Sequence, residues 1–171
     1  PNEHVLSAQK PRPGKKYLAS WRGNPKSNPA IRKKLLATLS GHSDVRMEKT
    51  TSWLDHADGE KWIYVNLILD SMFSLCPEGW APISFRVYES MPLGLAPVVI
   101  SDQCVLPDGP DWSSLCLRIP KNRLKHIYAI LENAASESHK MGCVARQEWE
   151  LYFSPANVGG YYSRRLIDCI Q

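Results

Sequence analysis

Residues 73–102 read FSLCPEGWAPISFRVYESMPLGLAPVVISD, and the expected fold class follows from this stretch. Two short apolar runs in it, Phe73–Cys76 and Pro97–Ser101, show no alternation of polar and apolar residues. Such runs are typical of strands buried on both faces, as in a parallel sheet. Between them, Ser84–Leu93 has the pattern of a helix that ends at Gly94. The stretch is therefore a predicted strand–helix–strand unit.

The rest of the chain continues this alternation in both directions. Further strands are predicted at Tyr17–Arg22, Val45–Trp53 and Leu115–Ile119. Further helices are predicted from Asn28-Pro29 to Gly41, over Glu60–Ser71, around Leu124–Leu131 and over Glu148–Ser154. The run WIYVNLIL within Glu60–Ser71 would also suit a buried strand, but its length and the alternation of elements favour a helix. We expect a doubly wound, Rossmann-like α/β domain over residues 17–171, with a parallel sheet of about five strands. A polar, proline-rich linker or leading arm is expected at residues 1–16.

The predicted helix before Gly41 has a clear apolar stripe. Its members are Ile31, Leu35, Leu36 and Leu39. Three basic residues, Arg32, Lys33 and Lys34, are expected on the opposite, solvated face.

The composition of the 171-residue chain excludes several classes of protein. With 43% hydrophobic and 22% charged residues, the chain can bury a core, and its apolar runs are too short to span a membrane. The net charge of +4 is a mild excess, so we expect no nucleic-acid partner. The five cysteines include no C-x-x-C pair, the five histidines show no ligand spacing, and no D-x-D occurs. No bound metal is therefore expected.

An open parallel sheet binds ligands at the carboxyl ends of its strands, which makes the loop after Cys76 the first candidate site. Gly79 allows close backbone approach, and Ser84 is placed to cap a helix whose first amides favour an anion. Arg86 can pair with a diphosphate, and Glu89, on the same helix face, can accept two ribose hydroxyls. The alternative is a structural ion pair between Arg86 and Glu89. No G-x-G-x-x-G or P-loop occurs, so a standard dinucleotide or ATP site is not expected.

In its motifs the stretch resembles the exostosin family of glycosyltransferases. The family patterns F-x-L-x-P-x-G, S-x-R-x-x-E-A and G-x-x-P-V-I-I-S-D correspond to Phe73–Gly79, Ser84–Ser90 and Gly94–Asp102. Further matches follow in family order at Leu18–Gly23, Leu106-Pro107, Asp111-Trp112 and Trp149–Ser154. Ser90 replaces the usual alanine, Leu95 a frequent cysteine and Asp108 an aromatic residue. These departures bear on the sugar preference more than on the fold.

The resemblance covers about Tyr17–Ser154 and implies the C-terminal, nucleotide-sugar-binding half of a two-lobed GT-B glycosyltransferase. The acceptor lobe would be missing from this chain or carried by a partner chain. The implied site residues are Arg86 for the donor diphosphate, Glu89 for the ribose, Gly79 and Ser84 for the phosphate loop, Arg22 and Gly23 for a phosphate from the opposite side, and Asp102 for the sugar or base.

The implied reaction is transfer of a sugar from a nucleotide sugar, expected to be a UDP-sugar, to a glycan acceptor without a metal cofactor. Retaining relatives of this fold place two glutamates eight positions apart, whereas Glu78 and Glu89 are eleven apart, which favours inversion. No residue qualifies as the base, so the chain alone is expected to be inactive. The expected location is cytoplasmic, or the Golgi lumen for a eukaryotic enzyme. A non-catalytic nucleotide-binding regulatory module and a nucleic-acid-binding domain remain as alternatives.

Overall fold

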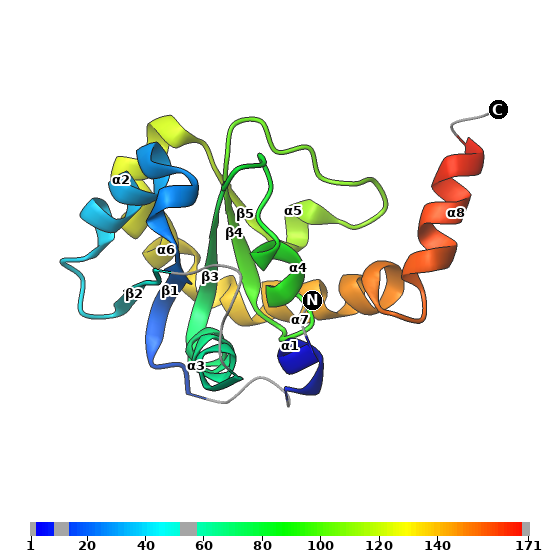
Figure 1. Cartoon of the computed structure of the whole chain (residues 1–171), viewed down its shortest axis with the longest axis horizontal. Helices are drawn as coiled ribbons and strands as arrows, with labels where there is room; N and C mark the ends of the chain where they lie inside the picture. The colour runs from blue at the N-terminus through cyan, green and yellow to red at the C-terminus, as the bar shows by residue number, and fades with distance from the viewer. Residues whose placement is uncertain (1–2, 9–13, 52–57, 169–171) are drawn as a thin grey trace.

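The computed structural model describes residues 3–8, 14–51 and 58–168. Its centre is a sheet of five parallel strands in the order β2-β1-β3-β4-β5 (Figure 1). The strands are β1 Tyr17–Gly23, β2 Val45–Lys49, β3 Ser71–Pro77, β4 Ala96–Ile100 and β5 Leu117–Ile119. This sheet confirms the predicted doubly wound α/β class.

Helices connect the strands and continue beyond β5. The α-helices are α1 Glu3–Ser7, α2 Pro29–Leu39, α3 Asp58–Leu69, α4 Arg86–Ser90, α5 Trp112–Leu115, α6 Ile127–Ala134, α7 Ser138–Glu148 and α8 Val158–Asp168. Short 3₁₀ segments lie at η1 Pro25–Ser27, η2 Lys121–His126 and η3 Ala135–Glu137, and a π-helical turn, η4, at Trp149–Phe153. No helix in these described stretches is both long enough and apolar enough to cross a membrane.

The two faces of the sheet carry separate cores. Leu35 and Leu39 of α2 and Leu131 of α6 pack with Phe73 of β3 on one face. On the other face, α4, α7 and η4 form a second cluster, and α1 packs with α3 in a third. Figure 1 shows α8 extending away from these layers, and Tyr161 is its buried residue.

The strand order places a topological switch point between β1 and β3. These strands are neighbours, with Ala19 opposite Phe73. After β1 the chain passes through α2 to β2 at the sheet edge, whereas after β3 it passes through α4 to β4 on the other side. Crevices at such points, outside the carboxyl ends of the strands, are where open α/β sheets bind ligands.

The α2 helix begins as predicted, and α4 is shorter than predicted. The Asn28 side chain accepts a hydrogen bond from the Ile31 amide, and Pro29 occupies the first turn. The segment expected as a helix over Ser84–Leu93 is helical at Arg86–Ser90. Pro92 lacks an amide hydrogen and cannot extend the helix, and the chain then turns at Gly94 with a φ of 68°.

Four α-helices were not predicted, namely α1, α5, α7 and α8. The α7 helix has a glycine near its middle, which lowers helix propensity, but packing explains that glycine. A Cβ at Gly142 would lie 2.2 Å from the carbonyl oxygen of Gly94. The helix backbone can therefore rest directly on the turn before β4 because residue 142 has no side chain.

The N-terminal arm contains regular structure where a linker was expected. Residues Glu3–Ser7 form α1, and Val5 is 1% exposed against α3. The prolines on which the linker prediction depended, Pro11 and Pro13, lie outside the described residues. So do the last two residues of the strand predicted over Val45–Trp53.

Of the four cysteines among the described residues, Cys76, Cys104 and Cys116 are buried free thiols, whereas Cys143 is exposed. Burial raises the pKa of Cys76 to about 12 and that of Cys116 to about 11. These two thiols are therefore protonated at neutral pH and act as core residues.

Candidate active site

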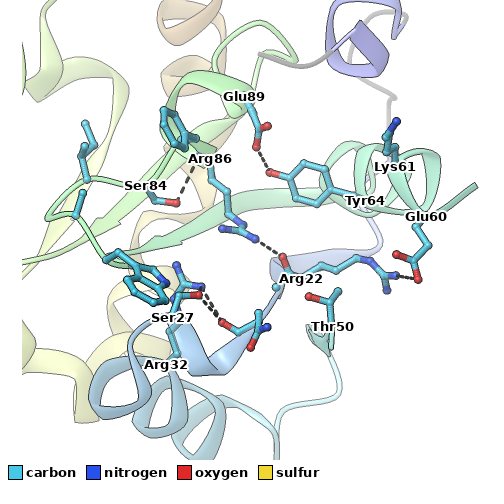
Figure 2. A pocket seen from close by; sticks show the side chains of 17 residues that line it. Arg22, Ser27, Arg32, Thr50, Glu60, Lys61, Tyr64, Ser84, Arg86 and Glu89 are labelled. Atoms are coloured by element: carbon cyan, nitrogen blue, oxygen red, sulfur yellow. Dashed lines mark hydrogen bonds and ion pairs between the residues drawn. The ribbon is translucent and has the colours of Figure 1, made fainter. Parts of the chain in front are cut away.

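A cleft of about 640 Å³ opens at the switch point, at the carboxyl ends of β1 and β3. Its walls come from the residues after β1, the loop between β3 and α4, the first residues of α4 and one face of α3 (Figure 2). The volume suits a ligand the size of a nucleotide or larger.

Arg86, the first residue of α4, crosses the cleft to the end of β1. Its Nη2 donates a hydrogen bond of 2.6 Å to the carbonyl oxygen of Arg22. Its guanidinium carbon lies 5.9 Å from the ring centre of Trp21 and 5.8 Å from that of Tyr64. The buried Nε has no hydrogen-bond partner among the described residues. A Cβ at Gly23 would lie 2.5 Å from Nη2, so this glycine makes room for the guanidinium.

Arg32 of α2 joins the two loops that form the cleft floor. The side chain is buried, and its Nη1 donates to the Asn24 carbonyl at 2.8 Å and to Ser27 Oγ at 2.7 Å, both after β1. Its Nε donates to the Glu78 carbonyl at 3.1 Å and its Nη2 to the Pro77 carbonyl at 3.4 Å, both at the end of β3. One guanidinium therefore ties both sides of the switch point together.

The buried position of Arg32 corrects the sequence prediction, which placed it on the solvated face of its helix. Arg32 stands three, four and seven residues before Leu35, Leu36 and Leu39, so it belongs to the same stripe as these leucines. The stripe faces the sheet, and its first turn reaches the cleft. This spacing was the signal that would have placed Arg32 at the site.

The two arginines concentrate positive charge without a carboxylate partner. Arg32 and Arg86 form no ion pair with any acidic side chain in the described part of the chain, and both guanidinium carbons lie within 6.0 Å of the Trp21 ring centre. Burial, with the nearby charge of Arg86, lowers the pKa of Arg32 from 12.5 to about 10. An anion bound in the cleft would balance the positive charge of the two arginines and raise the pKa of Arg32 again.

Glu89 also lines the cleft, and α3 holds its carboxylate. The Tyr64 hydroxyl donates a 2.7 Å hydrogen bond to Glu89 Oε2. Burial, and then the charge of Glu89, raise the pKa of Tyr64 well above 10, so the phenol stays protonated. Arg86 and Glu89 thus have different partners, and the alternative of a structural pair between them is not what the structure shows. Figure 2 shows Arg86 between the Tyr64–Glu89 pair and Arg32.

Arg22 contributes its backbone to the site more than its charge. Its Nη1 binds Glu48 Oε2 at 2.6 Å, and its Nη2 lies 3.8 Å from Glu60 Oε1. Burial raises the pKa of Glu48, but hydrogen bonds from Arg22 and Arg46 outweigh this and leave it below its usual value. The Arg22 charge is therefore already compensated by carboxylates.

Six of the seven predicted site residues line this cleft, and Asp102 does not. The six are Arg22, Gly23, Gly79, Ser84, Arg86 and Glu89. Ser84 Oγ accepts a 3.4 Å hydrogen bond from the Arg86 amide, and a Cβ at Gly79 would lie 2.9 Å from Arg32 Nη2. Asp102 is exposed and accepts a 2.8 Å hydrogen bond from the Lys121 amide at the start of η2.

Sequence reasoning also missed Tyr64 and Trp80. Tyr64 lies inside the ambiguous run WIYVNLIL, where periodicity could not show which side chain faces the site. Trp80 follows Gly79 in the loop and is 76% exposed at the cleft. An exposed tryptophan directly after a glycine in a strand-exit loop was a usable signal for a binding residue.

One protein-family model matches most of the chain. The sequence model of the exostosin GT47 domain matches residues 1–134. A probable glucuronoxylan glucuronosyltransferase of Arabidopsis thaliana is 39% identical over 75 residues, which is 43% of this chain and 16% of that protein. An exostosin-1 homolog of Caenorhabditis elegans is 32% identical over 114 residues, covering 66% of this chain and 28% of that protein.

A third relative is a probable β-1,4-xylosyltransferase of Arabidopsis thaliana, 35% identical over 69 residues, or 39% of this chain and 17% of that protein. The chain thus spans less than a third of the length of these relatives. Among solved structures, MurG of Acinetobacter baumannii matches with a TM-score of 0.49 at 12% identity, over 84% of this chain and 50% of that chain.

Proposed function

The chain belongs to the exostosin GT47 family of glycosyltransferases, and from this premise we propose that it is the donor-binding domain of an inverting enzyme. The donor is a UDP-sugar and the acceptor is a glycan. The acceptor site and the catalytic base are supplied from outside these 171 residues, by another part of the enzyme or by a partner chain.

The observation that carries the proposal is the pair of arginines at the switch point. Within the described part of the chain, Arg86 and Arg32 in the cleft have no carboxylate partner, and the buried Arg86 Nε has no hydrogen-bond partner. A diphosphate would offset this charge and accept hydrogen bonds from Arg86. Because α4 has only five residues, the guanidiniums carry this argument and the helix dipole does not.

Glu89 supports the nucleoside end of the proposed ligand. Tyr64 occupies Oε2, and Oε1 accepts no hydrogen bond from a described residue. A carboxylate oxygen in this position can accept a ribose hydroxyl. Glu89, the glutamate of the family motif, therefore has one carboxylate oxygen, Oε1, that can accept a hydrogen bond from a ligand in the cleft.

Inversion requires a single displacement at the anomeric carbon. The acceptor oxygen forms the new bond on one face while the bond to the diphosphate oxygen breaks on the other. Arg86 stabilises the negative charge that develops on the leaving diphosphate, and a base removes the proton of the acceptor hydroxyl.

Glu78 does not supply the second carboxylate that a retaining arrangement would need. Its Oε2 accepts from Ser101 Oγ at 2.7 Å, and its Oε1 accepts from Asn28 Nδ2 at 3.0 Å and from Lys121 Nζ at 2.8 Å. These contacts tie β3 to β4 and α2, away from the residues that line the cleft. The geometry thus supports inversion.

The relatives suggest the first donors to test. Their names point to glucuronosyl and xylosyl transfer, so we propose UDP-glucuronic acid and UDP-xylose as candidates. In this proposal the arginines balance the diphosphate charge, and no metal ion is needed for donor binding. All three relatives are proteins of plants or animals, which favours the Golgi lumen over the cytoplasm in this proposal.

Thermal unfolding with UDP, GDP, ADP and CMP tests the proposal. UDP should raise the melting temperature most, because a ligand that binds only the native state stabilises it. Added Mn²⁺ or EDTA should change this shift little. A protein that is folded by circular dichroism yet shows no shift at millimolar UDP would contradict the donor-site assignment.

Activity assays separate the enzyme from the regulatory alternative. The isolated chain should bind UDP but transfer sugar poorly. Transfer should appear when the missing acceptor portion is supplied. Undetectable transfer with that portion present, together with retained UDP binding, would favour a non-catalytic module.

A further inference from the structure

Trp80 is an exposed tryptophan at the edge of the cleft. It is 76% exposed although most tryptophans are largely buried, and it lines the same cleft as Arg86 and Arg32. Large aromatic side chains at the mouth of a pocket commonly mark a binding surface. The position of Trp80 relative to the charged residues indicates which part of a ligand it meets.

The contacts across the cleft have a defined order. At one end Tyr64 binds Glu89, and the Tyr64 ring also contacts Arg86. Arg86 and Arg32 then share contact with the Trp21 ring. At the other end the Arg32 guanidinium lies against Gly79, the residue before Trp80. The order is therefore carboxylate, first arginine, second arginine, and then the loop that carries Trp80.

This order matches the order of groups in a nucleotide sugar. With the ribose at Glu89 and the diphosphate at the arginines, the sugar extends toward the Gly79 end of the cleft. Resting on the proposed function, we propose that Trp80 packs against the pyranose ring of the donor sugar and forms the sugar subsite. One face of a pyranose carries mainly C–H bonds, and these pack well against the electron-rich face of an indole.

The loop that carries Trp80 is anchored at its base. The Gly79 amide donates a 3.2 Å hydrogen bond to the Ala81 carbonyl, which closes a tight turn around Trp80. Arg32 holds the preceding Glu78 carbonyl at 3.1 Å. Anchoring of this kind lowers the entropy cost of holding a side chain against a ligand.

The test compares Trp80→Ala with the parent chain by titration calorimetry. The probes are UDP, UDP-xylose and UDP-glucuronic acid, together with UMP and uridine. The affinity for UDP should stay within about twofold, while the affinity for at least one UDP-sugar should fall roughly three- to tenfold. Trp80→Phe should recover part of the loss, because it keeps an aromatic face.

Phe85→Ala is the matched control. Phe85 is 85% exposed and lines the same cleft, but it directly precedes Arg86 at the other end of the loop. It should leave the ratio of UDP-sugar to UDP affinity unchanged. Both variants alter exposed side chains and should fold, which circular dichroism checks.

Two results would overturn the sugar subsite. Unchanged affinity of Trp80→Ala for both UDP-sugars would show that Trp80 does not contact the sugar. An equal fall for UDP, UMP and uridine would place Trp80 against the base instead. Failure of the parent chain to bind UDP would reject the proposed function itself, and with it this inference.

Discussion

The guanidinium of Arg86 occupies the space that a side chain at residue 23 would need. A Cβ built on Gly23 would lie 2.5 Å from Arg86 Nη2 and 3.0 Å from Trp21 Cζ2. The end of β1 therefore accommodates Arg86, the arginine of the proposed donor site, because residue 23 has no side chain. The same relationship recurs at Gly79, where a Cβ would lie 2.9 Å from Arg32 Nη2. Arg86 and Arg32 therefore each lie against a glycine that leaves room for the guanidinium.

Gly23→Ala should weaken UDP binding without unfolding the protein. The added methyl group displaces the guanidinium, which is the flexible end of a side chain, so the melting temperature should fall by no more than about 2–4 °C. UDP affinity should fall on the order of tenfold because the arginine loses its position. Calorimetry measures the affinity, and Gly159→Ala, whose Cβ meets nothing within 4 Å, is the control. Unchanged affinity in Gly23→Ala would show that the position of Arg86 is not critical.

Arg86→Ala should weaken UDP binding far more than Arg22→Ala. A charge-assisted contact contributes roughly 1.5–3 kcal/mol, which corresponds to a ten- to hundredfold loss of affinity. The Arg22 side chain is bound to Glu48, and alanine keeps the carbonyl that positions Arg86. Calorimetric titrations of the two variants give the comparison, and equal losses would contradict this division of roles.

Glu89→Gln should lower the affinity for uridine as well as for UDP, because its proposed partner is the ribose. Inorganic pyrophosphate, which has no ribose, should bind as it does to the parent. Tyr64→Phe should show a weaker form of the same pattern, since it removes the hydrogen bond that holds the carboxylate. Competition titrations with these three ligands check both variants. Weaker binding of pyrophosphate alone would move Glu89 out of the ribose subsite.

Arg32→Lys should destabilise the fold although it keeps the charge. A lysine cannot reach the four acceptors that the buried guanidinium binds after β1 and β3, and unsatisfied buried carbonyls cost about 1–3 kcal/mol each. The free energy of unfolding in urea should fall by about 2–4 kcal/mol. Lys33→Ala, at an exposed position of the same helix, should change it by less than about 0.5 kcal/mol. An unchanged free energy of unfolding in Arg32→Lys would mean that the two loops do not depend on the hydrogen bonds of the Arg32 guanidinium.

The buried Cys76 thiol should make the fold sensitive to alkaline pH. Burial raises its pKa from 9.0 to about 12, so between these values the unfolded chain releases a proton that the folded chain retains. Stability is complete below pH 9 and is lost as the pH rises toward 12. At pH 10 the loss from this group is about 1.4 kcal/mol. Urea unfolding of the parent and of Cys76→Ala at pH 7 and pH 10, under reducing conditions, measures it. Between pH 7 and pH 10 the free energy of unfolding should fall less in Cys76→Ala than in the parent. An equal fall in both proteins would assign the pH dependence to other groups.

The strands were the most predictable part of the fold. β3 and β4 lie where short apolar runs predicted them, because a strand buried on both faces carries mainly apolar residues on both sides. The helix α4 is shorter than predicted because Pro92 stops it. The helix α7 was not predicted because Gly142 lowers the helix propensity of its sequence, and the packing against Gly94 that explains this glycine is a tertiary contact. Contacts of this kind leave no periodic trace in the sequence.

The candidate site was predictable where one loop carries it. Gly79, Ser84, Arg86 and Glu89 lie within eleven residues, so spacing and motif were sufficient to bring them together. Arg32 reaches the same cleft from a distant helix, and its place depends on which side of α2 faces the sheet. Asp102 lies two residues after the neighbouring strand β4, yet its carboxylate accepts a hydrogen bond from the Lys121 amide. This contact depends on where η2 lies in three dimensions.

The contact between Gly142 and Gly94 limits how this sequence can drift. A substitution at residue 142 must push α7 off the turn before β4, whereas Gly159 and Gly160 have open space around them. Glycine at 142 therefore cannot be replaced by small steps unless the helix and the turn change together. Among randomly mutated variants that still fold, residue 142 should remain glycine, whereas residues 159 and 160 should vary. Gly142 is thus constrained by a backbone contact, whereas Gly159 and Gly160 are free to vary.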